Sequence, residues 1–246
     1  MGHLQWEAYT ARMRANSTIR QAALATLCVA LGALSGTPAT GATRAPLAGY
    51  FSVQPDLRLC PAPDCGGFFV ALLNRQSVGC PGGGLGAMCH VTTVDWSRLG
   101  LDPAATKDFE KAALAGRAVV RGELQRGAGP RPTARLVVTE GWIAAGSRLP
   151  RGGGFFQVAS NGIVCVTYPC FSWRQTLLNT NRRGEVSGVN LLGAGAPEAS
   201  RNAAWTELES GSILVAGRLR NVPNAGPAGD GVELVASQFY LRVGGS

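Results

Sequence analysis

Short stretches of apolar and polar residues alternate along the chain after residue 48, and Gly, Pro or Asp residues bound most of them. Alternation of this kind predicts β-strands with one buried face. Asp102 followed by Pro103 predicts a helix start, with Asp as the N-cap, and Gly116 predicts its end. A second helix is expected at 200–210. The predicted strands are 50–53, 68–73, 90–96, 118–124 and 136–143, and then 155–158, 171–178, 186–192, 213–219 and 232–243.

The second set of elements resembles a copy of the first. At an offset of 105, residues Gly49, Phe51, Val53, Cys60, Cys65, Leu72, Leu73 and Asn74 fall without a gap on Gly154, Phe156, Val158, Cys165, Cys170, Leu177, Leu178 and Asn179. Farther along, at an offset of 95, Gly116, Val120, Gly122 and Leu124 fall on Gly211, Val215, Gly217 and Leu219. The difference of ten residues coincides with the Gly-rich segment 80–89. An internal duplication with one insertion is therefore expected.

Two side-chain patterns refine this picture. Gly122 and Gly217 lie inside strands of otherwise branched residues, where glycine is typical of a bulge or a sharp bend. Trp205 lies 96 positions after Phe109, so an aromatic side chain is expected to face the core from each helix.

Each copy has the order β-β-β-α-β-β, which predicts a mainly β fold with one helix per unit. This is the order of a small five-stranded Greek-key barrel of the OB kind. We expect two such barrels in tandem, with an α+β sandwich of similar order as the alternative. The first unit is expected at 43–144, the linker at 145–153 and the second unit at 154–246.

Residues 1–42 have the charged, apolar and small-residue order of a secretory signal peptide. The apolar run 21–34 follows three arginines and is shorter than the roughly 20 residues that a spanning helix needs. Cleavage after residue 41 or 42 would leave a secreted or periplasmic chain with no membrane span. Met13 gives a more compact signal than the first Met. Cys28 lacks the small residues expected before a lipidated cysteine.

Six cysteines remain in the mature chain, and an oxidising compartment favours their pairing. If each copy and the insertion hold their own pair, the disulfides are Cys60–Cys65, Cys165–Cys170 and Cys80–Cys89. The main alternative is a crossed pairing of Cys60 or Cys65 with Cys80 or Cys89.

The composition of the 246 residues, with 46% hydrophobic and 15% charged residues, excludes a disordered chain. Without three Arg and one Glu of the signal peptide, 20 basic and 14 acidic residues remain, a net charge of +6. These charges are scattered along the chain, so binding to nucleic acid is not favoured.

The first copy is similar to a family of exported bacterial proteins known as a domain of unknown function. The pattern is an Asp-x-Arg before the first Cys, a Pro before the second, and Gly-Gly-aromatic after it. It is formed here by Asp56, Arg58, Cys60, Pro63, Cys65, Gly66, Gly67 and Phe68. The resemblance implies export and no particular activity.

Catalytic chemistry has few candidates. His90 is the one histidine of the mature chain, so any Ser-His-Asp or Cys-His site must use it. A half-buried strand position is the simpler interpretation of His90. Zinc ligands would have to come from His90 and from Cys60, Cys65, Cys80 and Cys89. Export favours disulfide bonds between these cysteines, which would remove them as ligands. Asp95 with Glu123 or Glu140 would be the paired acids of an extracellular hydrolase active only in the first unit.

Binding is the favoured function. Small barrels bind oligosaccharides, oligonucleotides or proteins with a strand face and its loops. The aromatic residues that could stack a ligand are Trp96, Trp142, Tyr168 and Trp173, with core packing as the alternative for each Trp. The sequence therefore predicts a secreted, disulfide-stabilised tandem-domain binding or structural protein without a cofactor. Its expected partner is an extracellular glycan or protein.

Overall fold

The structure is a computed structural model that describes residues 47–59, 65–127 and 133–244. The predicted signal peptide lies outside the described residues. Thr43–Ser246 form one compact unit, in which we call residues 47–144 the first half and residues 154–243 the second half. The fold is mainly β, with one α-helix in each half and mostly antiparallel strand pairs.

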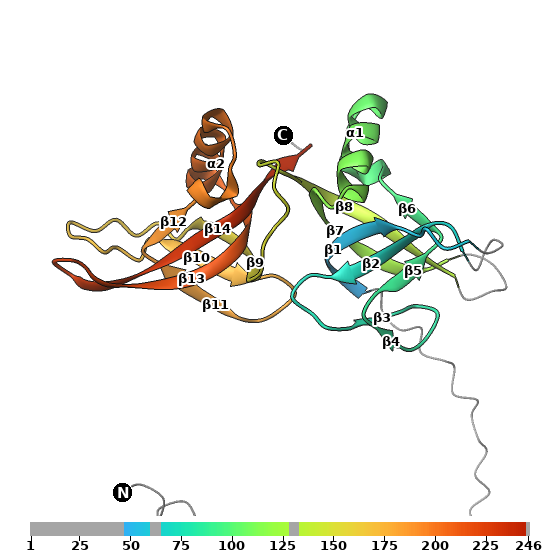
Figure 1. Cartoon of the computed structure of the whole chain (residues 1–246), viewed down its shortest axis with the longest axis horizontal. Coiled ribbons are helices and arrows are strands. Elements are labelled where there is room, and N and C mark those ends of the chain that lie inside the picture. Colours follow the sequence, from blue (N-terminus) through green and yellow to red (C-terminus); the bar gives the residue numbers. More distant parts are fainter. Residues whose placement is uncertain (1–46, 60–64, 128–132, 245–246) are drawn as a thin grey trace, which may run out of the picture. The chain divides into compact units, whose positions relative to one another are not determined.

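The two halves contain the same order of main elements (Figure 1). The first half contains β1 (Leu47–Pro55), β2 (Phe68–Leu72), β3 (Val78–Gly79), β4 (Leu85–Gly86), β5 (Cys89–Val91), β6 (Thr93–Asp95), η1 (Ser97–Leu99), α1 (Pro103–Leu114), β7 (Ala118–Arg126) and β8 (Ala134–Ala144). The second half contains β9 (Gly154–Ser160), β10 (Trp173–Leu177), β11 (Arg183–Val186), β12 (Gly188–Asn190), η2 (Leu192–Ala194), α2 (Glu198–Ser210), β13 (Ile213–Gly226) and β14 (Gly229–Val243). The small sheet β3–β4 belongs to the region of the expected insertion.

Local signals in the sequence correspond to the observed ends and bends of elements. The side chain of Asp102 accepts hydrogen bonds from the backbone N–H groups of Ala104 and Ala105, both at 2.9 Å, as an N-cap does. The pairing of β7 with β8 shifts register at Gly122, and that of β13 with β14 shifts at Gly217. The predicted bulges are confirmed at both glycines.

The third predicted strand of each half is divided in the structure. β5 pairs with β2, whereas β6 pairs in parallel with β8, and Thr92 separates them. In the second half β11 pairs with β10, β12 pairs in parallel with β14, and Ser187 separates them. At each break the residue donates its backbone N–H to the last strand of its half. The chain bends there because it changes its pairing partner, which alternation along the sequence does not reveal.

The helices fill their cores with different residues. Phe109 and Ala113 of α1 are buried, and Ala204 and Leu208 of α2 are buried at the positions 95 residues later. The prediction that Trp205 faces the core is wrong, because 37% of its surface is exposed. Trp205 lies 96 positions after Phe109, one residue beyond the equivalent position, and one residue of an α-helix turns the side chain by about 100° around the helix axis. In α1 the large buried residue comes first, Phe109 before Ala113, whereas in α2 it comes second, Leu208 after Ala204.

One path of paired strands runs through both halves, in the order β11-β10-β9-β13-β14-β8-β7-β1-β2-β5. The halves join where β14 pairs antiparallel with β8, from Tyr240 opposite Ala144 to Val243 opposite Gly141. This path is open at both ends and no closed barrel is formed along it. Of the expectation of two small OB-like barrels in tandem, the mainly β, mostly antiparallel fold is confirmed, but a closed barrel is not formed. The predicted linker holds to the sheet through Gln238, whose side chain bonds both backbone groups of Gly146.

Each half has its own hydrophobic core, and a third core lies between them. The third core consists of Leu73, Val119, Trp142, Ala144, Leu178, Leu214, Ala216 and Tyr240, with Tyr50 and Phe155 packed against it. It buries apolar surface from both halves, which makes their contact a continuation of the folded core. Among the described residues, no helix is long and apolar enough to cross a membrane.

Two asparagines connect the halves reciprocally. Asn179 accepts a hydrogen bond from the backbone N–H of Tyr50 at 2.8 Å and donates to the carbonyls of Tyr50 and Leu73 at 2.7 and 2.9 Å. Asn74 makes the matching three bonds to Phe155 and Leu178, at 2.8–3.0 Å. Both asparagines have φ of 58°, a left-handed conformation that Asn tolerates well. The Leu-Leu-Asn run that the two halves share is therefore an interface element.

Candidate functional site

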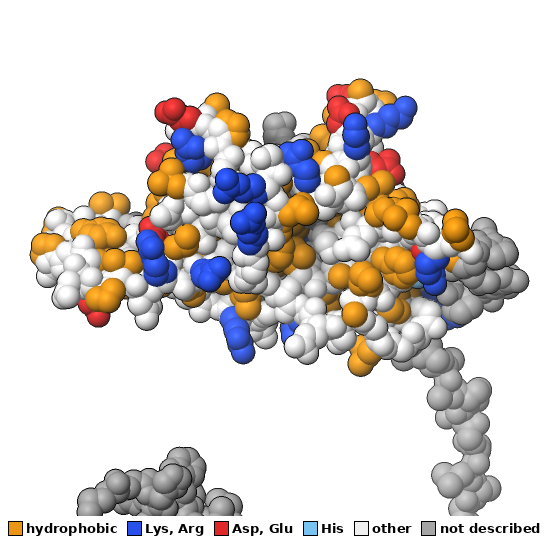
Figure 2. Space-filling view, in the orientation of Figure 1, with side chains coloured by type: hydrophobic (Ala, Val, Ile, Leu, Met, Phe, Trp, Pro, Cys, Tyr) orange, Lys and Arg blue, Asp and Glu red, His pale blue; other side chains and the backbone are white. Residues whose placement is uncertain are grey.

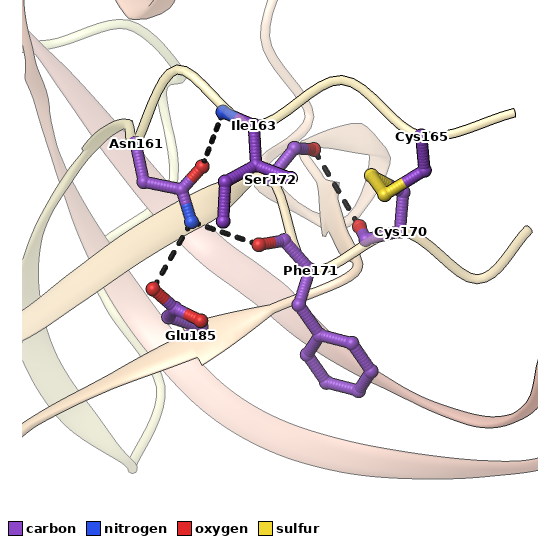
Figure 3. The surroundings of a disulfide bond; sticks show 7 residues. All are labelled: Asn161, Ile163, Cys165, Cys170, Phe171, Ser172 and Glu185. Atoms are coloured by element: carbon purple, nitrogen blue, oxygen red, sulfur yellow. Dashed lines mark hydrogen bonds between the residues drawn. A yellow bond between two sulfur atoms is a disulfide. The ribbon is translucent and has the colours of Figure 1, made fainter.

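The segment 161–172 connects β9 to β10 and forms a loop at one end of the second half. The disulfide Cys165–Cys170 closes it, with the two Cα atoms 5.7 Å apart. Figure 3 shows this disulfide beyond the base of the loop, where Asn161 and Ser172 lie near each other. A covalent closure over so few residues limits the conformations of the loop tip.

Asn161 organises the base of this loop (Figure 3). Its amide donates to the carbonyl of Phe171 at 2.8 Å and to the carboxylate of Glu185 at 3.1 Å, and its side-chain oxygen accepts from the N–H of Ile163 at 3.0 Å. The backbone N–H of Asn161 also donates to Ser172 O at 2.9 Å. The loop is thus held at its base by hydrogen bonds and near its tip by a disulfide.

The tip presents apolar side chains to solvent. Val164 and Val166 are 94% and 104% exposed, and Ile163 and Tyr168 are about half exposed. Isolated exposed apolar residues are common on protein surfaces, whereas several on one short, braced loop indicate a contact surface. We call Ile163, Val164, Val166 and Tyr168 the apolar tip.

The hairpin between β13 and β14 supports the apolar tip from one side. The backbone N–H of Ala228 donates to the carbonyl of Tyr168 at 3.0 Å. A Cβ at Gly226 would lie 2.4 Å from that same carbonyl oxygen, so only glycine allows this approach. In Figure 2 the left end of the view, where loop and hairpin lie, is covered mainly by hydrophobic and uncharged side chains.

The corresponding region of the first half has a charged arrangement. The Asp56 carboxylate has no exposed surface and accepts hydrogen bonds from the Arg58 side chain at 2.8–3.2 Å. Its Oδ2 lies 3.3 Å from Nε2 of His90, and the Arg58 guanidinium lies 4.9 Å from the centre of the Phe69 ring. The hydrogen bonds from Arg58 lower the pKa of Asp56 to about 2. Leu57 and Leu59 are exposed here, and residues 60–64 lie outside the described part of the chain.

The sequence did not predict the contact between the Asp56 carboxylate and the His90 ring. His90 lies on β5 with a quarter of its side chain exposed, and its Nε2 is also 2.6 Å from the carbonyl oxygen of Gly66. Ser77, Asp95 and Ser97, the partners considered from the sequence, form no hydrogen bond with it in the described structure. The Asp-x-Arg pattern is a sequence signal for the bonds between Asp56 and Arg58, because an Asp can bond the backbone and side chain of a residue two positions later. It carries no signal for the contact with His90.

The other acidic candidates have local partners. Glu140 forms ion pairs with Arg121 at 2.7 Å and Arg242 at 3.0 Å. Asp95 accepts hydrogen bonds from the side chain and from the backbone N–H of Ser97, and these two bonds lower the pKa of Asp95. Glu123 accepts from Gln125 at 3.0 Å. No hydrogen bond joins these acids to one another in the described residues.

The predicted aromatic residues lie in different environments. Trp96 packs edge-on against Phe109 in the first core, and Trp142 is 2% exposed in the third core. Trp173 is partly buried beside Trp205, with ring centres 5.8 Å apart. Tyr168 alone of the four lies in the apolar tip. An enclosed ring cannot stack on a ligand, so Trp96 and Trp142 serve packing in this structure.

The disulfides also bear on metal binding. Cys80 pairs with Cys89 and Cys165 with Cys170, two of the three local pairs that the duplication predicts. Pairing of Cys80 with Cys89 excludes the crossed alternative. Cys65 is also disulfide-bonded, and Cys60 lies outside the described residues. Within the described ranges, no three His, Cys, Asp or Glu residues are placed to hold a metal ion.

Comparisons with known proteins identify the family of this chain. No curated protein and no solved structure matches the chain. A family model described as a domain of unknown function, DUF6748, matches residues 49–246, which include both halves and the link between them. The chain therefore belongs to the DUF6748 family.

Proposed function

We propose that this chain is an exported, disulfide-stabilised, tandem-domain binding protein. Export rests on the signal-peptide pattern of residues 1–42 and on the disulfides, which persist in oxidising compartments. Disulfides at Cys80–Cys89 and Cys165–Cys170 stabilise loops between strands, where binding residues are commonly found.

The tandem organisation is part of the same proposal. Each half is interpreted as an OB-like unit that arose by internal duplication. The support is the order of pairing: in the first half β2 pairs with β1, β1 with β7 and β7 with β8, and β6 returns in parallel to β8. The second half has the matching pairs, including β12 with β14. In OB folds the loops between strands 1 and 2 and between strands 4 and 5 form the binding end.

The apolar tip is the proposed contact surface, and its occupant is an uncharged, apolar face of a partner protein. The observation that carries this is the exposure of Val164 and Val166 on a loop that a disulfide and Asn161 hold in place. Rigid apolar side chains lose little conformational entropy on binding and gain from burial. The neighbouring hairpin extends the surface through Pro223, Pro227 and Ala228, which are exposed.

The charge of this end favours a protein over a lipid membrane. Residues 161–172 contain no charged side chain, and residues 222–230 contain only Asp230. Anionic membrane surfaces attract Lys and Arg, which this end lacks. A partner face without charge, or with a single cation opposite Asp230, fits it better.

The alternative, a hydrolase active only in the first half, has weaker support. Its expected acids are engaged in ion pairs or hydrogen bonds with Arg121, Arg242, Ser97 and Gln125. The Asp56 carboxylate beside His90 is held by Arg58, and a nucleophile bonded to His90 is absent from the described residues.

Site-specific photo-crosslinking tests the docking proposal. A photoreactive residue is placed at position 164 or, as a matched control, at position 85, where Leu85 is 76% exposed on the small sheet of the first half. The mature protein is exposed to the exported proteins of its source, and adducts are identified by mass spectrometry. The identified partner is then purified and titrated against wild-type, V166E and L85E proteins.

We expect one partner to crosslink from position 164, and we expect V166E to weaken its binding by at least about tenfold, since a buried carboxylate without a partner is costly. L85E should bind as the wild type does. Adducts of equal yield from both positions, or binding that V166E leaves unchanged, would contradict the proposal. Sedimentation with phosphatidylcholine and phosphatidylglycerol vesicles, lost in V166E, would replace it with a membrane site.

A further inference from the structure

A polar groove of about 780 Å³ lies between the halves, at the turns that follow β2 and β10. The two turns come together near the middle of the view in Figure 1. The groove is lined by Arg75, Gln76 and Ser77 from the first half and by Thr180, Asn181 and Arg182 from the second. Its volume is in the range of small-molecule sites, which often occur where two domains meet.

The frame of the groove is rigid. Asn74 and Asn179, which each make three hydrogen bonds across the interface, directly precede the lining residues in the chain. The Nε of Arg75 donates to the backbone carbonyl of Asn179 at 2.7 Å, which fixes the direction of its guanidinium group. Leu73 and Leu178 anchor the turns in the third core. A ligand would meet a preformed site and would spend little free energy on ordering it.

The lining is cationic. Arg75 and Arg182 contribute positive charge, and no Asp or Glu lines the groove. Neither arginine forms an ion pair among the described residues, in contrast to Arg121, Arg220 and Arg242, each of which has a carboxylate partner. Guanidinium groups bind carboxylate oxygens with two parallel hydrogen bonds. The groove is therefore suited to an anion.

Corresponding positions in the two turns carry different side chains. Arg75 corresponds to Thr180, and Ser77 corresponds to Arg182, at the offset of 105. The backbone frame is nearly symmetric, but the two charges come from non-equivalent positions. Besides Leu47, Leu72, Leu177 and Gly79, the remaining lining residues carry amides and hydroxyls, which both donate and accept hydrogen bonds. Because the two arginines are placed asymmetrically, such a lining can distinguish the two ends of a ligand. Its amides and hydroxyls can bond hydroxyl groups that lie beside a negative charge on the ligand.

We propose that this groove binds a small hydroxylated carboxylate of the sugar-acid class. The carboxylate pairs with Arg182 or Arg75, and the hydroxyl groups bond to Gln76, Ser77 and Asn181. The lining contains no aromatic ring, so it offers no platform for a nucleobase. This site is separate from the apolar tip and does not depend on the function proposed for it.

Calorimetric titration with galacturonate and galactose tests this proposal, because the two sugars differ by the carboxylate. We expect galacturonate to bind the mature protein at least about tenfold more tightly than galactose, and more weakly at high salt. R182A should reduce galacturonate affinity by at least about tenfold. R183A is the matched control: Arg183 is the neighbouring exposed arginine and does not line the groove, so its removal should leave binding unchanged.

Three outcomes would overturn the proposal. The first is absence of galacturonate binding, and the second is equal weakening by R182A and R183A, which would indicate a general effect of net charge. The third is inorganic phosphate binding as tightly as galacturonate and competing with it, which would indicate a general anion site. Thermal melts of both variants show whether a loss of affinity reflects a loss of folding.

Discussion

Residues at corresponding places of the two halves have different roles. In the first half, Asp56 binds Arg58 and approaches His90, whereas in the second half Asn161 bonds Ile163 and Glu185. Both side chains accept a hydrogen bond from the backbone N–H two residues later, Asp56 after β1 and Asn161 after β9. Between these two regions, as far as the structure describes them, the second-half one carries the uncharged apolar tip, whereas the first-half one carries the Asp56–Arg58 ion pair. The difference between these two regions thus begins with single side chains.

The charge on Asp56 should make stability depend on pH. Its folded-state pKa is about 2, compared with the ordinary value of 3.8. A lowered folded-state pKa stabilises the native state at pH above about 4, and this stabilisation is lost as the pH falls from about 4 to about 2. D56N should therefore show a weaker fall in stability over this range than the wild type.

Urea unfolding measured at several pH values between 2 and 6 checks this expectation. D108N, a change at an exposed position of α1, serves as the control and should follow the wild-type curve. A D56N protein whose stability falls as steeply with acid as that of the wild type would show that the Asp56 charge does not stabilise the fold.

At the level of elements, the bulges at Gly122 and Gly217 determine where long strands bend. A Cβ at Gly122 would lie 2.4 Å from the carbonyl oxygen of Val137, and one at Gly217 would lie 2.3 Å from that of Val235. These atoms belong to the backbone of the partner strand, so a side chain cannot be accommodated by a rotamer change. The third strand of each half bends for a different reason, the change of partner at Thr92 and Ser187.

Substitution at the first bulge should be costly. G122A is expected to destabilise the protein by about 2 kcal/mol or more, because β7 must move away from β8. G188A provides the control, since Gly188 is also in a strand and a Cβ there would lie 3.7 Å from the Glu233 side chain, an ordinary contact. Urea unfolding measures both variants, and equal stability of G122A and G188A would refute the steric explanation.

At the level of the whole molecule, Thr43–Ser246 form one compact unit because the halves share strand pairs, hydrogen bonds and a core. The third core joins buried residues from both halves, including Trp142 and Tyr240. The Trp142 indole N–H has no hydrogen-bond partner among the described residues, so its contribution there is apolar packing. Separate folding of the halves would expose this surface to water.

Coupling of this kind predicts a single unfolding transition for residues 43–246. Calorimetric and van't Hoff enthalpies of unfolding should agree. N179A removes three hydrogen bonds between the halves and should lower stability by about 2–4 kcal/mol. N181A, a change of the same kind at an exposed neighbour, should have little effect. Two separate transitions in the wild type would contradict the coupling.

Local sequence signals determined where most helices and strands lie and where two of the strands bend. Alternation located the main strands except for the break in the third strand of each half and the small sheet β3–β4; Asp102 with Pro103 located the start of α1, and the glycines located both bulges. These features depend on residues a few positions apart, whose physics is contained in the sequence. The placement of Trp205 was wrong because helix packing depends on the phase of the turn to within one residue.

The tertiary structure alone decided the contacts between distant residues. Pairing of β8 with β14, the bonds of Asn74 and Asn179 across the halves, and the approach of His90 to Asp56 join residues at least 34 positions apart. The Leu-Leu-Asn run was visible in the sequence, but nothing local shows that each asparagine bonds the other half. Such contacts depend on which apolar surfaces remain uncovered after each half has formed its own core, and this is a property of the folded chain.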